Sequence, residues 1–209
     1  MAKPPDPKLA APLNALAARD PDLAKALADC GLPPRRKSPA GFPGLLRIIV
    51  SQQVSTASAA AILTKLKTRM PRATPRAFLK LDEADLVASG FSRAKMRYAT
   101  ALAEDIVARR IDLAALPQME DEAAIAHLTA AKGIGRWSAE IYLLFSMGRA
   151  DIMPAGDLAL QVAAQRLKGW RERPDDKALR KLAEDWSPHR SAAARFLFHA
   201  YRHPGLPEV

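Results

Sequence analysis

A glycine-rich turn and a later aspartate are the two features of this sequence best suited to chemistry. The turn is Lys132-Gly-Ile-Gly-Arg136, which lies between two segments with helical patterning. Its two glycines, Gly133 and Gly135, permit positive φ and the close approach of a phosphate, and the N–H groups at a helix N-terminus bind anions. Trp137 follows the turn directly, and Asp157 comes later along the chain. A phosphate-binding turn, an aromatic ring and a carboxylate together indicate a site that works on a nucleic acid.

Each of these features also has a purely structural interpretation. A Gly-x-Gly turn can be a plain connection between two helices, and an aspartate after a glycine is a common helix N-cap. By periodicity alone Trp137 is a core residue. The flanking cations Lys132 and Arg136 favour a phosphate clamp, which contacts the DNA backbone without sequence preference. Capping and catalysis are compatible for Asp157, because a carboxylate is stabilised in its ionised form at a helix N-terminus.

The composition limits the class of protein. The chain has 209 residues, with 32 Lys and Arg against 22 Asp and Glu, a net charge of +10. This excess favours an anionic partner such as nucleic acid, although solubility alone explains it equally well. The one cysteine, Cys30, excludes an intramolecular disulfide and a cysteine-rich zinc or iron–sulfur site. A cytoplasmic, reducing setting fits this cysteine content.

The hydropathy pattern indicates an all-α chain without a membrane partner. The N-terminus lacks the apolar run of a secretory signal, and no stretch is long and apolar enough to span a membrane. Alanine is abundant and β-branched residues are sparse, which favours helix over strand. Nothing in the pattern indicates more than a monomer. Two helices are expected within residues 9–30, broken near Asp20-Pro21, and further helices over 42–53, 56–69, 75–80, 83–88, 93–109, 121–130, 135–147, 158–167, 175–185 and after Ser187-Pro188.

Four motifs carry a resemblance to a known family. Lys132-Gly-Ile-Gly-Arg-Trp-Ser-Ala139 followed by Pro154-Ala-Gly-Asp157 resembles the helix–hairpin–helix DNA glycosylase superfamily, most closely its DNA-3-methyladenine glycosylase II branch. The likeness runs from Phe42 to about Tyr201. The other motifs are Ile48-Ile-Val-Ser-Gln-Gln-Val-Ser55, Gly90-Phe-Ser-Arg-Ala-Lys95 and Trp186-Ser-Pro-His-Arg-Ser191. Their order makes the match specific, whereas the hairpin alone would indicate only a DNA-binding module.

The resemblance implies an architecture of two helical lobes with the active site in the cleft between them. Residues 42–157 are then the core lobe, with the hairpin at 128–140. Residues 158–209 form the C-terminal lobe, on which the tail and helices of residues 1–41 pack. No extra β-containing N-terminal domain is expected, because the segment before Phe42 is short and helical in composition.

The resemblance also implies the reaction. Asp157 is the catalytic residue: its carboxylate stabilises the positive charge that builds on the sugar near C1′ and orients the attacking water. Trp137 stands where the bifunctional branch has a lysine, and an indole forms no Schiff base. The expected reaction is therefore monofunctional hydrolysis that leaves an abasic site. The rivals are a bifunctional glycosylase/lyase for oxidised or mismatched bases and a non-catalytic DNA-binding module.

An aromatic base pocket is implied for alkylated purines such as 3-methyladenine and 7-methylguanine. Alkylation makes the base cationic, so that it stacks well on electron-rich rings. The pocket residues implied are Trp137, Phe198 and Ile141, of which Ile141 departs from the tyrosine of some relatives. Core packing is an equally good interpretation of Phe198.

The remaining residues implied by the resemblance contact double-stranded DNA that carries alkylated bases. Two loops fill the gap left by the extruded base, with Gln53 in one and either Phe91 or Ser92 in the other. The adjacent glutamines Gln52 and Gln53 indicate an exposed polar turn, and Ser89-Gly-Phe-Ser92 indicates a turn with an exposed aromatic. The structural alternatives are a polar turn and a buried loop aromatic. No cofactor is required and no iron–sulfur cluster is expected, but a monovalent cation, Na⁺ or K⁺, is possible on backbone carbonyls. The hairpin residues are Lys132, Gly133, Ile134, Gly135 and Arg136, and the carbonyls are those of Thr129, Ala131 and Ile134.

Overall fold

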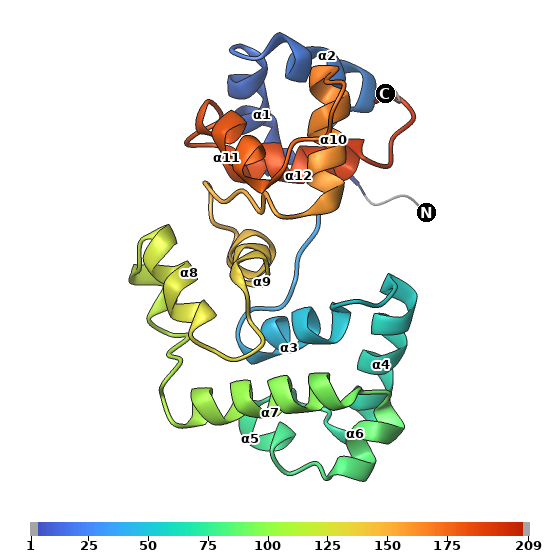
Figure 1. Cartoon of the computed structure of the whole chain (residues 1–209), viewed down its shortest axis with the longest axis vertical. Coiled ribbons are helices and arrows are strands. Elements are labelled where there is room, and N and C mark those ends of the chain that lie inside the picture. The colour runs from blue at the N-terminus through green and yellow to red at the C-terminus, as the bar shows by residue number, and fades with distance from the viewer. Residues whose placement is uncertain (1–3, 207–209) are drawn as a thin grey trace. The chain divides into compact units, whose positions relative to one another are not determined.

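The computed structural model describes residues 4–206 and is helical throughout (Figure 1). Within these residues there are twelve α-helices and no strand, apart from an isolated bridge between Pro5 and Pro34. The prediction of an all-α fold is confirmed. The chain divides into two compact units: the hairpin unit, Ser38–Tyr142, and the terminal unit, Met1–Lys37 with Leu143–Val209. No helix within residues 4–206 has the length and apolar character needed to cross a membrane.

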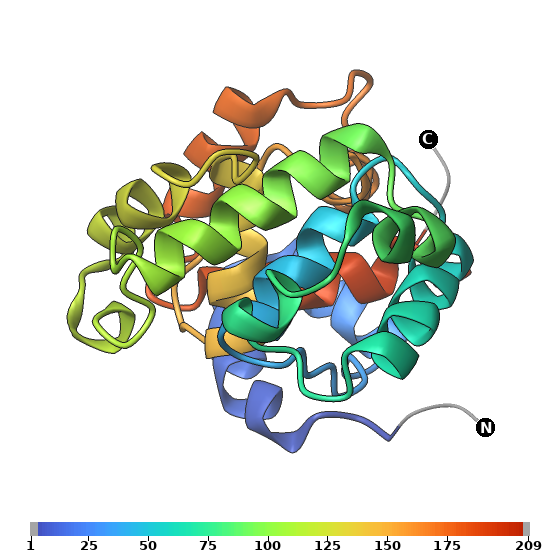
Figure 2. The same cartoon turned by 90° about the horizontal axis from the view of Figure 1, so that it is seen from below.

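The hairpin unit is built around a single apolar helix. α3 (Phe42–Ser51) buries most of its side chains, including Leu45, Ile49 and Val50, because apolar residues occupy nearly all of its positions. It packs against α4, α7 and α9, and α7 also runs alongside α5 (Figure 2). The other helices are α4 (Thr56–Arg69), α5 (Pro75–Phe78), α6 (Glu83–Ser89), α7 (Arg93–Val107), α8 (Asp121–Thr129) and α9 (Arg136–Tyr142).

The terminal unit joins the two ends of the chain. The predicted break at Asp20-Pro21 is confirmed, since it separates α1 from α2. α12 is buried along most of its length and packs against α1, α2 and α10. The helices of this unit are α1 (Ala10–Ala17), α2 (Pro21–Cys30), α10 (Leu158–Lys168), α11 (Asp176–Glu184) and α12 (Arg190–Ala200).

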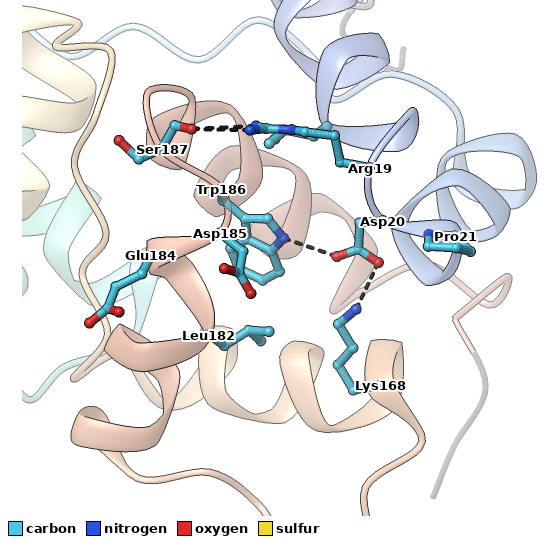
Figure 3. A pocket seen from close by; sticks show the side chains of 10 residues that line it. Arg19, Asp20, Pro21, Lys168, Leu182, Glu184, Asp185, Trp186 and Ser187 are labelled. Carbon is cyan, nitrogen blue, oxygen red and sulfur yellow. Dashed lines mark hydrogen bonds and ion pairs between the residues drawn. The ribbon is translucent and has the colours of Figure 1, made fainter.

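A partly buried ion pair joins the N-terminal helices to the C-terminal ones within this unit (Figure 3). The Asp20 carboxylate accepts hydrogen bonds from Lys168 Nζ at 2.7 Å and from Trp186 Nε1 at 3.0 Å, and it also caps α2 through the Leu23 N–H. Burial alone would raise the pKa of Asp20, but these three donors hold it below its ordinary value. The first helices of the chain are thereby tied to α10 and to the segment after α11.

The division between the units and two helix bounds differ from the expectations. The division falls between Tyr142 and Leu143, so residues 143–157, which we expected in the core lobe, group with the terminal unit. The helix expected over 135–147 ends as α9 at Tyr142 and continues as a π-helical turn, η3 (Leu143–Met147). Ser187-Pro188 does not start α12, which begins at Arg190; the Ser187 hydroxyl donates instead to Asp151 Oδ2 at 2.8 Å.

Candidate active site and nucleic-acid interface

The predicted hairpin is present as the turn between α8 and α9, and its two glycines have different roles. Gly133 has φ +88°, and a Cβ added there would lie 2.4 Å from Cγ of Tyr98 on α7. Gly135 is not among the residues with positive φ, and no atom outside its own neighbours lies within 4 Å of where its Cβ would be. Gly133 therefore serves the fold, while Gly135 leaves open space at the start of α9.

The two cations of the hairpin also differ. Arg136 Nε donates to Glu140 Oε1 at 3.0 Å, and its Nη2 donates to Glu122. The Glu122 hydrogen bond is the first cause of the raised pKa of Arg136. Through Glu122, Arg136 joins α9 to α8. The Glu140 side chain is only 2% exposed, and the two carboxylates balance much of the charge on Arg136. Lys132, by contrast, is exposed in the turn itself.

The Gln53 loop, residues 52–55 between α3 and α4, lies against the hairpin. Gln52 Nε2 donates to the carbonyl oxygen of Gly133 at 3.1 Å and to Ser138 Oγ at 3.3 Å. Gln53 has φ +55°, in the left-handed region that non-glycine residues seldom adopt. The structure thus brings together the predicted loop and the predicted hairpin through Gln52, which the sequence assigned only to an exposed polar turn.

The prediction of Phe91 as an inserting wedge is wrong. Its ring is 5% exposed and lies 6.1 Å from the ring of Phe78, in the core of the hairpin unit. Its neighbour Ser92 is exposed and caps α7 by accepting the Lys95 N–H at 3.3 Å. The ring of Phe91 was interpreted as exposed. A phenyl ring has no polar group that loses its hydrogen bonds to water on burial, and in the core it adds packing contacts.

Two predicted pocket residues and the predicted cation ligands also belong to the hairpin unit. Trp137 and Ile141 lie one turn apart on α9, and both are partly exposed. The carbonyl oxygen of Ala131 accepts the Ile134 N–H at 3.1 Å, which leaves it a second lone pair. The side chains of Ala131 and Ile134 are hydrocarbon, so only the main-chain oxygens of these residues are suited to ligate an ion. The Thr129 hydroxyl donates to the carbonyl oxygen of Ala126.

Asp157 belongs to the terminal unit and is the N-cap of α10, as predicted. Its Oδ1 accepts the Ala159 N–H at 2.9 Å, and the carboxylate is partly exposed. The preceding residues are held by side chains of two helices: Gln161 Nε2 donates to the carbonyl oxygen of Ala155 at 2.9 Å, and Arg180 Nη1 donates to that of Met153 at 3.2 Å. These contacts hold the backbone of residues 153–155, which leads into Asp157.

A second anchor holds the start of the same segment to the first turn of α12. The Asp151 carboxylate accepts hydrogen bonds from Ser187 Oγ and from the Arg190 backbone and guanidinium, each between 2.8 and 2.9 Å. Burial alone would raise the pKa of Asp151, but these donors lower it. The Trp186-to-Ser191 motif therefore supports the stretch that carries Asp157.

Phe198, the third predicted pocket residue, lies on α12 in an aromatic and cationic cluster. Its ring centroid is 5.7 Å from that of Phe145 in η3. The guanidinium carbons of Arg36 and Arg195 lie 5.2 and 5.1 Å from the Phe145 ring. Burial lowers the pKa of Arg195. The sequence did not single out Phe145 or Arg195, because nothing local indicates that their segments meet.

Two surface hollows lie elsewhere. One, of ≈ 490 Å³, surrounds the Asp20 ion pair of the terminal unit (Figure 3). The other, of ≈ 530 Å³, lies in the hairpin unit along α6 and α7 and reaches Lys132. Asp157 lines neither hollow. Neither of these two hollows therefore contains the predicted catalytic carboxylate.

Comparison with known proteins agrees on one family. The chain matches the model of the HhH-GPD superfamily base excision DNA repair protein over residues 46–189. It is 31% identical over 181 residues to the alkylbase DNA glycosidase-like protein mag2 of Schizosaccharomyces pombe, covering 84% of each chain. It is 32% identical over 163 residues to DNA-3-methyladenine glycosylase 1 of the same yeast, covering 75% of this chain and 71% of that relative.

Solved structures agree with the sequence comparison. The 3-methyladenine DNA glycosylase Mag1 of Schizosaccharomyces pombe, in complex with abasic DNA, is similar with a TM-score of 0.81 and 29% identity, over 90% of this chain and 94% of that one. DNA-3-methyladenine glycosidase of Bacillus halodurans is similar with a TM-score of 0.82 and 30% identity, over 91% of this chain and 89% of that one.

Proposed function

Because the chain belongs to the HhH-GPD superfamily of base excision DNA repair proteins, we infer that it is a monofunctional DNA glycosylase. It hydrolyses the N-glycosidic bond of alkylated purines in duplex DNA and leaves an abasic site. The observation that carries this inference is the likeness, over most of both chains, to glycosylases named for 3-methyladenine. The residues assigned below are our proposals for how this chain performs the reaction.

Asp157 is the proposed catalytic residue. As the glycosidic bond lengthens, its electron pair leaves with the base and positive charge builds at the sugar C1′. A carboxylate held in place by the Ala159 N–H stabilises that charge, because it needs no reorganisation during the reaction. Water then bonds to C1′ and gives a proton to the carboxylate, which acts as a general base. The N-terminus of α10 favours the ionised form that both roles need.

Trp137 explains why the reaction stops at base removal. Its indole has no amine that could attack the sugar, so no Schiff base forms and the strand stays intact. Trp137, Ile141 and Phe198 are the residues that we propose to contact the base. A purine alkylated at N3 or N7 carries a positive charge, which aromatic faces attract and which also makes the base a better leaving group.

The proposed DNA contacts lie mainly in the hairpin unit. Lys132 and the N–H groups of Gly133 and Gly135 bind a phosphate, while the Ile134 N–H donates within the turn to the carbonyl oxygen of Ala131. Arg136 holds the two helices together. Gln53 and Ser92 fill the gap left by the extruded base. The turn carbonyls of Thr129, Ala131 and Ile134 are neutral oxygen donors, a set that suits a hard monovalent cation.

We further propose that the chain acts as a monomer. The partner is double-stranded DNA with an alkylated base, inside the cell and on the nucleoid if the source is bacterial.

The test compares wild type with Asp157→Asn on duplex DNA that contains 3-methyladenine or 7-methylguanine. We expect base release to fall by orders of magnitude while binding to abasic DNA persists. Asp175→Asn is the matched control, since Asp175 caps α11 in the same way, accepting the Ala178 N–H at 2.7 Å. Equal base release by wild type and Asp157→Asn would remove Asp157 from the mechanism.

The same substrates separate the rival functions. A covalent adduct trapped by borohydride would establish a strand-cleaving enzyme. Strand breaks that appear only after alkali are the expected result for a monofunctional one. A wild-type protein that binds these DNAs and releases no base would be a DNA-binding module.

A further inference from the structure

Gln52 connects two parts of the hairpin unit that are far apart in sequence. Its Nε2 donates to the main-chain oxygen of Gly133 and to the hydroxyl of Ser138, at 3.1 and 3.3 Å. Ser138 is 2% exposed, so this end of the bridge is shielded from water. One side chain therefore links the Gln53 loop both to the turn of the hairpin and to the first turn of α9.

The residue after Gln52 has a backbone conformation that needs outside support. Gln53 has φ +55°, where the Cβ of an L-residue crowds the following carbonyl oxygen. Such a conformation persists only where the surroundings over-determine it. The helices flanking the loop are both fixed: Lys95 Nζ donates to the carbonyl oxygen of Val50 at 2.7 Å, and Ser55 Oγ accepts the Ser58 N–H at 3.1 Å. Between these two anchors, Gln52 is the contact that ties the loop to the hairpin.

The hairpin end of the bridge is equally fixed, by the same helix that anchors α3. The main chain at Gly133 lies so close to the Tyr98 ring that no Cβ fits between them. Tyr98 and Lys95 both belong to α7, three residues apart. Lys95 is 8% exposed and holds the last turn of α3. α7 thus supports the loop on one side and the hairpin on the other, and Gln52 closes the connection between them.

We propose that Gln52 is a positioning residue that couples the hairpin to the Gln53 loop, so that the hairpin's grip on the phosphate backbone determines where Gln53 enters the duplex. This rests on the proposed function of the hairpin and of Gln53. Without the bridge, the hairpin still binds phosphate, but the turn at Gln53 is free to relax away from its left-handed conformation. Base extrusion then slows, while the chemistry at Asp157, a residue of the other unit, is unchanged.

This coupling has a signature that a general loss of structure lacks. A base with no partner costs less to extrude than a paired one, so its removal depends less on the inserting loop. Loss of Gln52 should therefore slow excision from paired sites selectively. The ratio of the two rates is the informative quantity, because a poorly folded variant would lose both together.

The experiment replaces Gln52 by methionine, which has similar length and no donor, and measures single-turnover release of 7-methylguanine. With the lesion opposite cytosine we expect the rate to fall about tenfold or more, as a small misplacement of a positioned group can do. With the lesion opposite an abasic analogue we expect a fall of less than about twofold. Ser138→Ala, which removes one of the two acceptors, should give an intermediate ratio. Gln165→Met, which deletes the Nε2 bond to the carbonyl oxygen of Arg171 in the terminal unit, is the matched control and should leave both rates unchanged.

A second measurement does not depend on catalysis. We place 2-aminopurine beside an abasic analogue and follow its fluorescence at saturating protein, since insertion of the loop unstacks the probe. Gln52→Met should lower the fluorescence rise while the Kd for the same DNA stays within about twofold, because the phosphate contacts remain. Equal falls in excision at paired and unpaired sites, or an unchanged fluorescence rise, would overturn the coupling. Absence of base release by the wild type would count against the proposed function instead, and the fluorescence comparison would still decide the role of Gln52.

Discussion

Replacing each glycine of the hairpin by alanine should affect a different property: fold stability for Gly133 and DNA binding for Gly135. Gly133→Ala places a methyl group 2.4 Å from Tyr98 Cγ and 2.7 Å from Tyr98 Cβ, in a backbone with φ +88°. Gly135→Ala places one in open space, in a backbone without positive φ. The first change therefore perturbs the fold, whereas the second perturbs only what approaches from outside.

The expected loss in the free energy of unfolding of Gly133→Ala is the sum of two costs. A left-handed conformation costs an L-residue about 1–2 kcal/mol, and forcing extra atoms into a packed site costs typically about 1–3 kcal/mol. The atoms in contact lie at the base of the Tyr98 side chain, which moves less readily than its tip. We expect a loss of about 2–5 kcal/mol, a large share of the roughly 5–15 kcal/mol of a typical domain.

Thermal unfolding followed by circular dichroism measures this loss, at about 2–4 °C per kcal/mol for a chain of this size. Tyr98→Ala in the same chain removes the contact with Cγ but leaves Tyr98 Cβ 2.7 Å away, and it does not remove the backbone cost. The double variant should therefore recover only part of the loss, about 1 kcal/mol, relative to additivity. Gly135→Ala should unfold within about 1 kcal/mol of wild type. Its affinity for abasic duplex DNA should drop about tenfold, the equivalent of about 1.4 kcal/mol. If Gly133→Ala proves as stable as Gly135→Ala, the close packing of the hairpin on α7 is refuted.

Two further predictions concern charged residues. Asp20→Asn should cost about 1.5–3 kcal/mol at neutral pH, the usual worth of hydrogen bonds to a charged group, whereas Asp22→Asn removes only the more exposed partner of Lys168 and should cost at most about 1 kcal/mol. The folded-state pKa of Asp20 is lowered, so its contribution to stability is present above the ordinary pKa of 3.8 and is lost as the pH falls through the folded-state pKa. The urea unfolding curves of wild type and Asp20→Asn should therefore converge in acid, and a constant difference would be the contrary result. Lys132→Ala should reduce the slope of log K against log salt for binding to duplex DNA by about 1. The Arg136 guanidinium is paired with Glu122 and Glu140, so Arg136→Ala should change this slope less and lower the unfolding temperature more. Equal slopes for the two variants would remove the distinction between these cations.

The sequence predicted best those features that depend on a few neighbouring residues. Ser55 directly precedes the helix expected over 56–69, and Asp157 precedes the one expected over 158–167. Both side chains accept a backbone N–H, from Ser58 and Ala159 respectively. Such caps are local, since the side chain and its donor lie in the same turn. The break at Asp20-Pro21 is of the same kind, because proline favours the first turn of a helix.

Features that depend on contacts distant in sequence were missed or wrongly predicted. Phe91 was interpreted as exposed, but Phe78 and the rest of the core cover its ring. Arg136 was assigned to DNA, although Glu122, fourteen positions earlier, holds its guanidinium. The sequence places residues of the right type in the hairpin, but it does not say which of their charges are already balanced within the protein.

The adjacent glutamines were predicted to lie in one turn, but their different roles were not predicted. Gln52 and Gln53 together indicated an exposed polar turn. In the structure Gln52 has extended backbone angles and Gln53 has left-handed ones, so the chain turns sharply between α3 and α4. Of the two, Gln52 contacts the hairpin, by donating a hydrogen bond to the carbonyl oxygen of Gly133. That oxygen belongs to a glycine fixed by packing rather than by charge, so the position of the loop should be insensitive to salt even though DNA binding is not. We therefore expect added salt to lower the affinity for DNA, because the phosphate contacts are screened, and to leave the position of the inserting loop unchanged.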